Sequence, residues 1–506
     1  MPLRKQPSSL RCLAQEALLV LGEGLWQSAF SNGLKASLLE APALRTYLAK
    51  LQSAVDHSLT TSLIERLEES LISLRRHLRI RSFLEALFPA LLNNKVTALD
   101  ICFKDPMIQD CIIKTLPKFS SLHTLRVGCK EVNALQESID DIVKSVPCFS
   151  CITDLCVLGI CNRNLLSKVS STCRLLRSLD IRYSIAITDE DTACLTVCKS
   201  LQRIDFYGTS CTSHSVSVLL GSLPLLSDIG AWDQLNDVIR SVTSRDQDIH
   251  HLNLTRFVTN QIPAVFLQSI CRNITEVCLT MASISPPDLL PVFNNLRKLT
   301  VDLPRTAAGV NLFHCFGIYF TTRLHELRFS SSFVGKKDLA YLSYCAPYLK
   351  SLELRDLVKE QDILKPYPRF SFNFLLHVQV VDVPLSLVET LMKRSFALES
   401  ISICLRRKSK SLITDDWMAS ILSSNPLRRL NKLSIQSDNT LTMLTVRSLI
   451  NKCSALKWID TLSTWGGITF TELEDFRREI RRNNLALIID SSGDGCGASD
   501  RNSLPS

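Results

Sequence analysis

Apolar residues recur along most of this chain at a fixed spacing, with three apolar positions at i, i+3 and i+5. In a strand, residues two apart point the same way, so the last two positions of each copy predict one face of a short strand. Between copies, apolar residues at helical spacing, such as Leu165, Leu166 and Val169, predict a helix. The clearest copies are Leu122/Leu125/Val127, Leu176/Leu179/Ile181, Leu201/Ile204/Phe206, Ile249/Leu252/Leu254, Ile274/Val277/Leu279, Leu296/Leu299/Val301, Leu324/Leu327/Phe329, Leu349/Leu352/Leu354, Leu398/Ile401/Ile403 and Leu430/Leu433/Ile435. Weaker copies start at Val96, Ile152, Leu226, Leu375 and Leu456.

The copies mostly start about 22 to 32 residues apart, with steps clustering at about 25, which is the period of leucine-rich repeats. One strand and one helix cannot bury their own apolar faces, whereas about fifteen such repeats stack into one continuous core. The pattern therefore predicts an α/β leucine-rich-repeat solenoid. We expect a ribonuclease-inhibitor-like horseshoe with strands on the inner side and helices on the outer side.

Residues 1–95 lack the repeat and show the pattern of helices. Ser62 and Glu65 form a capping box ahead of a helix with its leucines on one face, and another helix is expected at 81–93. We expect an all-helical N-terminal cap or adaptor-binding region at 1–95 and an array of about 15 repeats at 96–490. A Ser-, Gly- and Asp-rich tail at 491–506 is expected to be disordered.

Several repeats carry a cysteine three residues before the first apolar position, and two predicted helices begin with Ile-Thr-Asp. The cysteines are Cys173, Cys198, Cys271 and Cys453, and the helix starts are Ile187-Thr188-Asp189 and Ile413-Thr414-Asp415. These features resemble the cysteine-containing leucine-rich repeats of F-box substrate receptors, over roughly residues 96 to 480. Threonine is a good helix N-cap and a small buried cysteine suits the turn before a strand, so both features have a structural explanation. An F-box itself, with its Leu-Pro start, is not found in the sequence.

The first segment contains a different adaptor signal. Residues 9–18, Ser-Leu-Arg-Cys-Leu-Ala-Gln-Glu-Ala-Leu, resemble the elongin-binding BC box that opens PRAME-like and Zer-type leucine-rich-repeat receptors. The resemblance implies that Leu10 and Leu18 insert into the elongin groove, with Ser9 and Ala14 part of the same box. Ala14 stands where the family has cysteine. The alternative is that this helix only caps the open end of the solenoid, which every repeat array requires.

The residue between the two apolar positions of each strand projects from the inner face. That central row is predicted to be Asp100, Arg126, Cys156, Asp180, Asp205, Gly230, Asn253, Cys278, Thr300, Arg328, Glu353, Gln379, Ser402, Ser434 and Asp460. The acidic excess of the row favours a basic protein segment over nucleic acid, because acidic side chains repel phosphates. The candidate partner-binding residues are Asp100, Arg126, Asp180, Asp205, Asn253, Arg328 and Glu353. A solvated polar row without a binding role is the alternative.

Composition limits the class of protein further. Apolar residues make up 46% and charged residues 21% of the chain, which is typical of a globular protein. The net charge of +9 is spread along the sequence apart from one basic run at 406–410. The 19 cysteines lack zinc-site spacing, and no nucleotide-binding or nucleophile motif occurs, so no metal, cofactor or catalytic residue is expected. No apolar run is long enough to span a membrane and no secretory signal is evident, which predicts the cytoplasm, the nucleus or both.

Two functional hypotheses follow. The first is a non-catalytic substrate-recognition subunit of a cullin-type ubiquitin ligase, in which the repeats hold a protein substrate. Its N-terminal helices would bind elongins B and C or a Skp-type adaptor, and through it a cullin. The second is an interaction scaffold or regulator that is unconnected to ubiquitin. The fold supports both, because many scaffolds share the same architecture.

Overall fold

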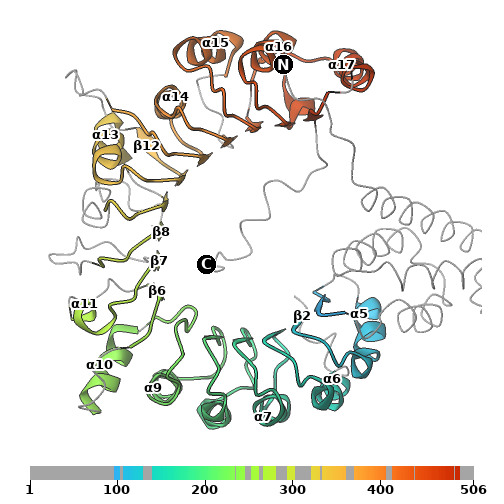
Figure 1. The fold of residues 1–506 in the computed structure, drawn as a ribbon, viewed down its shortest axis with the longest axis vertical. Helices are drawn as coiled ribbons and strands as arrows, with labels where there is room; N and C mark the ends of the chain where they lie inside the picture. Colours follow the sequence, from blue (N-terminus) through green and yellow to red (C-terminus); the bar gives the residue numbers. More distant parts are fainter. Residues whose placement is uncertain are drawn as a thin grey trace, which may run out of the picture. The chain divides into compact units, whose positions relative to one another are not determined.

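The structure of the chain is a computed structural model, shown in Figure 1. It describes residues 96–102, 106–128, 139–233, 235–245, 252–260, 266–280, 293–302, 321–330, 333–359, 370–405, 413–437, 439–483 and 485–489. The expected N-terminal helices, including the BC-box residues Ser9, Leu10, Ala14 and Leu18, lie outside the described residues, as does the tail. The chain divides into two compact units, with the boundary between Phe257 and Val258.

The first unit is built from repeats, each with a short strand on one side and a helix on the other. Its strands are β1 (Ala98–Asp100), β2 (Thr124–Gly128), β3 (Asp154–Leu158), β4 (Ser178–Asp180) and β5 (Arg203–Asp205), which form one sheet in sequence order. Its helices are α5 (Pro106–Ile113), α6 (Ile139–Ser145), α7 (Arg163–Thr172), α8 (Asp189–Thr192), α9 (Ser213–Ser222) and α10 (Leu235–Arg245), with 3-10 turns η2 (Leu116–Lys118), η4 (Val146–Cys148) and η5 (Ala193–Val197). Within this unit the strands line the inner side of the arc and the helices line the outer side (Figure 1).

The second unit continues the same alternation in a ten-stranded sheet whose first strand, β6 (Arg256–Thr259), contains the boundary. The other strands are β7 (Glu276–Thr280), β8 (Lys298–Asp302), β9 (Glu326–Ser330), β11 (Ser351–Arg355), β13 (His377–Val381), β14 (Ser400–Cys404), β15 (Lys432–Gln436), β16 (Trp458–Asp460) and β17 (Ile488–Ile489), while β10 (Phe333–Val334) and β12 (Val358–Lys359) form a separate pair. The helices are α11 (Leu267–Ile270), α13 (Lys336–Cys345), α14 (Leu385–Arg394), α15 (Asp415–Ser424), α16 (Met443–Lys452) and α17 (Phe470–Arg482), with the 3-10 turn η8 (Leu462–Thr464).

Parallel register confirms the repeat. Leu99, Leu125, Leu155, Leu179 and Ile204 are direct partners on β1 to β5, and each side chain is at most 3% exposed. In the second unit the same position is filled by Val277, Leu299, Leu327, Leu352, Val378, Ile401, Leu433 and Ile459, again in direct register. Identical apolar positions thus stack strand on strand into a continuous aliphatic layer within each unit, as a leucine-rich-repeat solenoid requires.

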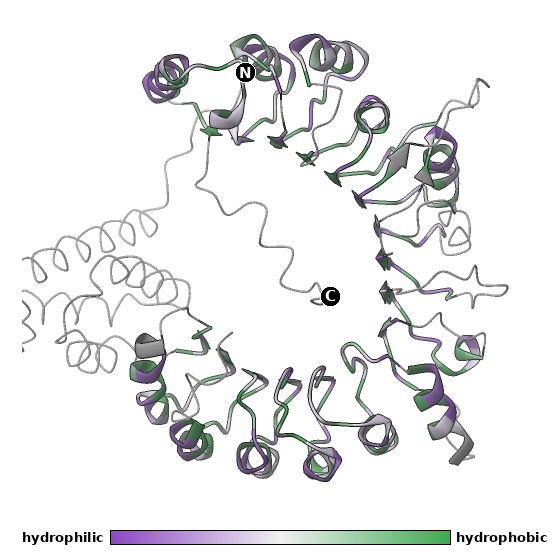
Figure 2. Cartoon of the chain, turned by 180° about the vertical axis from the view of Figure 1, so that it is seen from behind, coloured by the Kyte–Doolittle hydropathy of each residue, from purple (hydrophilic) through white to green (hydrophobic). Residues whose placement is uncertain are grey.

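The helices cover this layer with one apolar side and expose the other. Helix α7 buries Leu165, Leu166 and Val169, the set that its helical spacing predicts. Hydropathy mapped onto the chain shows hydrophilic stretches on the helices, most clearly on α17, and hydrophobic residues along the strands and turns (Figure 2). No helix in the described part of the chain is long and apolar enough to cross a membrane.

The Ile-Thr-Asp sequences at 187–189 and 413–415 begin helices as expected, and their aspartates also connect neighbouring repeats. Asp189 at the start of α8 accepts hydrogen bonds from the backbone amide and hydroxyl of Thr212, the N-cap of the following helix α9. Asp415 at the start of α15 does the same with Thr442, the N-cap of α16. Each carboxylate therefore accepts a hydrogen bond from the backbone amide at the start of the next helix, and one such link lies in each unit.

One predicted repeat is wrong. The copy that starts at Ile249 was expected to place Asn253 in the central row, but β6 covers Arg256–Thr259 and its buried apolar residue is Phe257. Asn253 precedes the strand, and its side-chain amide donates to the carbonyl oxygen of Pro224 at 2.8 Å. The error arises because Leu252 and Leu254 stand two apart and imitate a strand, whereas Phe257 offers the larger side chain to the core.

Candidate partner-binding face

The predicted central row exists on the inner face of both units. In the first unit Asp100, Arg126, Cys156, Asp180 and Asp205 are direct partners on adjacent strands. In the second unit the ladder aligns Cys278, Thr300, Arg328, Glu353, Gln379, Ser402, Ser434 and Asp460. Of the seven candidate residues, six lie in this row, and Asn253 does not.

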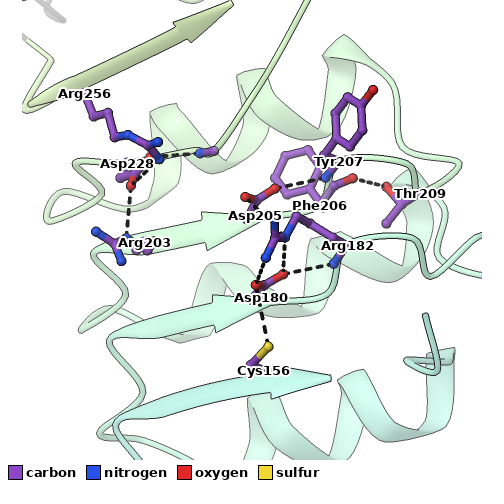
Figure 3. Close-up of polar contacts among 11 residues, drawn as sticks. Cys156, Asp180, Arg182, Arg203, Asp205, Phe206, Tyr207, Thr209, Asp228 and Arg256 are labelled. Atoms are coloured by element: carbon purple, nitrogen blue, oxygen red, sulfur yellow. Dashed lines mark hydrogen bonds and ion pairs between the residues drawn. The ribbon is translucent and has the colours of Figure 1, made fainter. Parts of the chain in front are cut away.

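One group of charges in the first unit surrounds Arg182, two residues after the end of β4 (Figure 3). Its Nε and Nη2 atoms donate to the two oxygens of Asp180, at 2.9 and 2.8 Å. The same Nε lies 3.6 Å from Oδ2 of Asp205 on the next strand. Two carboxylates therefore share one guanidinium, and Asp180 holds the larger part of it through a bidentate pair. The pKa of Arg182 is raised chiefly by its hydrogen bonds to Asp180, so its positive charge is fixed.

Because Arg182 is bonded to Asp180, the negative charge of Asp205 is only partly balanced by a positive charge. Burial, together with the negative charges of Asp180 and Asp228, raises the pKa of Asp205 to about 6, against the lowering effects of Arg182 and the amide of Tyr207. The backbone amide of Tyr207 donates to Oδ1 of Asp205 at 3.2 Å. A carboxyl with this pKa gains from any further cation that approaches it, because the opposite charge favours the ionised form.

A second group of charged residues lies in the next repeat. Asp228 is 4% exposed and accepts from Nε of Arg203 at 3.0 Å, from Nη1 of Arg256 at 3.4 Å and from the amide of Gly230 at 2.9 Å. Here one carboxylate has two arginine partners, the reverse of the ratio around Arg182. The two neighbouring groups therefore present opposite local charge on one face.

Gly230 lies between these two groups and leaves the space that Asp205 uses. Its φ of +68° lies in the left-handed region that favours glycine, and a Cβ at this position would be 2.5 Å from Cγ of Asp205. Any other residue would push the carboxylate aside. The absence of a side chain in the central row at this repeat is thus a requirement of the Asp205 geometry.

Aromatic rings border the acidic group on the side where the strands end. Tyr183 and Tyr207 contact each other edge to face, with ring centroids 6.0 Å apart, and Phe206 contacts Trp232 at 5.2 Å. Tyr183 has a φ of 63° and is 38% exposed. Exposed tyrosine beside charged groups is typical of protein-binding surfaces, because it offers apolar area and a polar group at low entropic cost.

The second unit balances its inner charges more evenly. Arg328 lies 3.5 Å from Asp302 and 3.7 Å from Glu353, and Arg355 also pairs with Glu353. Further along, Lys432 lies 3.0 Å from Asp460. Arg355 stands two positions after Glu353 on the same face of one strand, whereas Lys432 and Asp460 lie on neighbouring strands. Counting only one residue per strand missed Arg355 and Lys432, each of which pairs with an acidic residue of the central row.

The cysteines of the repeat motif are buried, neutral thiols. Cys173, Cys198, Cys271 and Cys453 are each at most 1% exposed, and all described cysteines are free. Burial raises the pKa of Cys173 to about 12 and that of Cys198 to about 11, so neither is a thiolate at neutral pH. Within the described ranges, no three His, Cys, Asp or Glu side chains are grouped so as to hold a metal ion.

Comparisons with known proteins find distant structural similarities and no family. No family model and no curated protein matches the sequence. A leucine-rich-repeat protein of Leptospira interrogans is 13% identical, with 79% of this chain and 91% of that chain covered and a TM-score of 0.38. A chain of the yeast Rad7–Elc1 complex is 13% identical over 92% of this chain and 96% of that chain, with a TM-score of 0.38. A Listeria monocytogenes internalin is 13% identical over 76% and 94%, at a TM-score of 0.29.

These similarities are too distant to place the chain in a family. The fold class rests on the strand register and the stacked apolar layer described above. By that architecture the protein is an α/β leucine-rich-repeat solenoid.

Proposed function

We propose that this chain is a protein-binding leucine-rich-repeat protein whose inner face, around Asp180, Arg182 and Asp205, holds a basic group of its partner. The observation that supports the proposal is that Asp205 has to share Arg182 with Asp180, while burial raises the pKa of Asp205 to about 6. A partner's lysine or arginine would restore the missing positive charge at this point. Phosphate would be repelled by the same carboxylate, which favours protein over nucleic acid on this face.

The geometry also predicts how binding depends on pH. A cation binds the ionised form of Asp205, and protonation of this carboxyl with a folded pKa of about 6 removes its charge. We therefore expect affinity to fall as the pH is lowered through 6. The variant Asp205→Asn should bind more weakly at pH 7.5 and show a smaller loss of affinity between pH 7.5 and pH 5.

Affinity capture with quantitative mass spectrometry tests the proposal on the full chain. Proteins that associate through this face should be captured by the intact chain and lost with Asp205→Arg. Asp237→Arg is the matched control, because Asp237 is exposed on α10 of the same unit and the change in charge is identical. If Asp205→Arg captures the same proteins in the same amounts as the control, the inner face of this unit is not the binding site.

For the finer function, we propose a substrate-recognition subunit of a cullin-type ubiquitin ligase, with elongins B and C or a Skp-type adaptor bound by the N-terminal region. Its support is the resemblance of residues 9–18 to a BC box, with Leu10 and Leu18 at the positions that enter the elongin groove. The chain itself would be non-catalytic, and we propose the cytoplasm or nucleus as its location. The alternative is a scaffold or regulator without a connection to ubiquitin.

Co-purification separates these two functions. Elongins B and C should be recovered with the intact chain, reduced by Leu10→Ala with Leu18→Ala, and absent when residues 1–30 are deleted. Ala14→Cys restores the family's residue and should increase recovery. The scaffold alternative predicts instead that the deletion lowers thermal stability and removes no partner. Recovery of neither elongins nor a Skp-type adaptor with the intact chain would refute the ligase function.

A further inference from the structure

The turns that lead into the strands of the second unit form one continuous edge. At this edge the backbone amide of each repeat donates to the carbonyl oxygen of the equivalent residue in the repeat before, at 2.7 to 2.8 Å. The residues so linked are Thr275, Arg297, His325, Lys350, Leu376, Glu399, Asn431 and Lys457. We call the turn edge these residues together with the three residues that precede each of them. Because the register is unbroken, equivalent positions follow one another at intervals of about 4.8 Å.

The turn edge is basic at both ends. Arg272, Arg297, Arg323 and Lys350 lie on its first four repeats, and Arg428, Arg429 and Lys457 lie on its last two. All seven side chains belong to exposed residues, and none forms an ion pair with another described residue. Their hydrogen bonds are to neutral groups, such as that of Arg323 to the side-chain oxygen of Asn295 at 2.6 Å. Exposed cations without acidic partners create an attractive field for an anionic ligand.

Between the two basic ends lie two repeats of different character. Phe374 and Phe396 are 49% and 52% exposed, and the ring of Phe374 packs at 5.2 Å against Tyr348 of the preceding repeat, itself 49% exposed. In these two repeats, the residues that form the backbone hydrogen bonds of the edge are Leu376 and Glu399. Glu399 is the one acidic residue of the turn edge. Exposed aromatic side chains that adjoin one another mark interaction surfaces. The turn edge is thus positive, then apolar with one negative charge, then positive again.

The order of basic and apolar residues along the turn edge favours an acidic protein segment over a nucleic acid strand. A nucleic acid strand carries a phosphate at every step, so it would place several charges against the apolar middle and against Glu399. A protein segment can carry acidic residues at its ends and apolar residues in the middle, which matches the edge position by position. The eight repeats span roughly 34 Å at strand spacing, a length covered by about ten residues of extended chain.

We propose that the turn edge of the second unit is a docking site for a protein segment with acidic ends and an apolar, aromatic middle. The site is distinct from the inner face of the first unit, because it uses other residues and the opposite charge. It therefore does not depend on the function proposed for Asp205.

Fluorescence anisotropy with a labelled peptide tests this site on the full chain. The probe has four acidic residues at each end and Leu-Phe-Phe-Leu in the middle, and the comparison peptide has the same composition with acidic and apolar residues alternating. Charge reversal by Arg428→Glu with Arg429→Glu should raise the Kd of the probe tenfold or more. Phe374→Ala should raise it about threefold, since one exposed ring is lost. The comparison peptide should bind at least fivefold more weakly than the probe.

Matched controls separate docking from general electrostatics. Arg481→Glu with Arg482→Glu makes the same change in charge at the exposed end of α17 in the same unit and should change the Kd less than twofold. Asp205→Arg should leave probe binding unchanged, so failure of the inner-face proposal would not affect this one. Absence of probe binding, equal binding of the alternating peptide, or no effect of the reversal at 428 and 429 would overturn the proposal. Tighter binding of a twelve-nucleotide single strand that the same reversal abolishes would assign the edge to nucleic acid instead.

Discussion

The two units share one backbone plan and differ in the charges placed on it. On the inner face of the first unit, Asp180 and Asp205 divide one guanidinium, that of Arg182. At the corresponding layer of the second unit, Glu353 lies between two guanidinium groups, those of Arg328 and Arg355. At the same ladder position, the acidic residue is therefore only partly balanced by positive charge in the first unit and fully balanced in the second.

The comparison shows which positions the repeat constrains. Apolar positions are fixed by stacking, because each must fill the same layer as its neighbours. Positions on the inner face and at the turn edge contact solvent, so their charges can change from repeat to repeat without disturbing the fold. Differences between the units at those positions are consequently the better guide to function.

The largest effect on stability is expected from shortening a core leucine in either unit, which tests whether the two cores are packed equivalently. Leu179 and Leu433 occupy the same ladder position, and each is at most 1% exposed. Either change to alanine should lower the free energy of unfolding by about 2–5 kcal/mol, through lost burial and the cavity left behind. Urea unfolding followed by circular dichroism measures both. A cost below about 1 kcal/mol for one of them would show that its layer is not packed as a repeat core.

A smaller effect is expected at the aspartates that link repeats, Asp189 and Asp415. Although burial would raise the pKa of each carboxyl, hydrogen bonds from Thr212 and Ser215, or from Thr442 and Thr445, hold it below its ordinary value. Asp189→Asn and Asp415→Asn should each cost about 1–2 kcal/mol at pH 7, because a charge-assisted hydrogen bond is weakened.

The pH dependence of these two variants follows from the lowered pKa. The stabilisation by the carboxylate is complete above the ordinary pKa of 3.8 and is lost as the pH falls through the lower folded value. The difference between wild type and variant should therefore shrink when unfolding is repeated below pH 4. Asp416→Asn, at the exposed neighbour of Asp415, is the control and should stay within about 0.5 kcal/mol of wild type.

The smallest effect has opposite signs in the two units. Because the folded pKa of Asp205 is about 6, its ionisation weakens folding progressively from the ordinary value of 3.8 up to pH 6 and by a constant amount above it. Asp205→Asn should accordingly raise the free energy of unfolding at pH 7 by about 1 kcal/mol, and the gain should vanish below pH 4. Glu353→Gln should lower it by a similar amount, since two arginines lose their shared partner. Thermal melts at pH 7 and pH 4 measure both, and a destabilising Asp205→Asn at pH 7 would contradict the interpretation.

Sequence alone predicted the aliphatic layer of the solenoid because stacked leucines repeat over many copies. It also placed Asp180, Asp205 and Glu353 in the central row, which follows from the two-residue period of a strand. It failed at Asn253, where Leu252 and Leu254 precede the strand but have the spacing of one, and the true strand contains Thr259 in place of an aliphatic residue. Whether Phe257 or the pair Leu252 and Leu254 belongs to the strand depends on how the neighbouring repeat is packed, and a single sequence does not show that packing.

The electrostatics of the site were only partly predictable. The acidic residues of the central row were identified, but the basic residues that pair with them, such as Arg182 and Lys432, were not considered although they face the same side. The raised pKa of Asp205 depends on its burial and on the donation of the Arg182 hydrogen bonds to Asp180, and neither is encoded in spacing. The turn edge was missed for another reason, since its basic residues are scattered in sequence and only the stacked register brings them into line.

The hydrogen bonds from Asp189 to Thr212 and from Asp415 to Thr442 bear on how such a chain can gain or lose repeats. A duplication or excision whose junction falls between the two partners separates a carboxylate from the helix start that it serves, while a junction that keeps them together preserves the pair. The natural module for exchange between related chains, or for engineering a longer or shorter array, therefore runs from one aspartate to the threonine of the next helix and not from strand to strand.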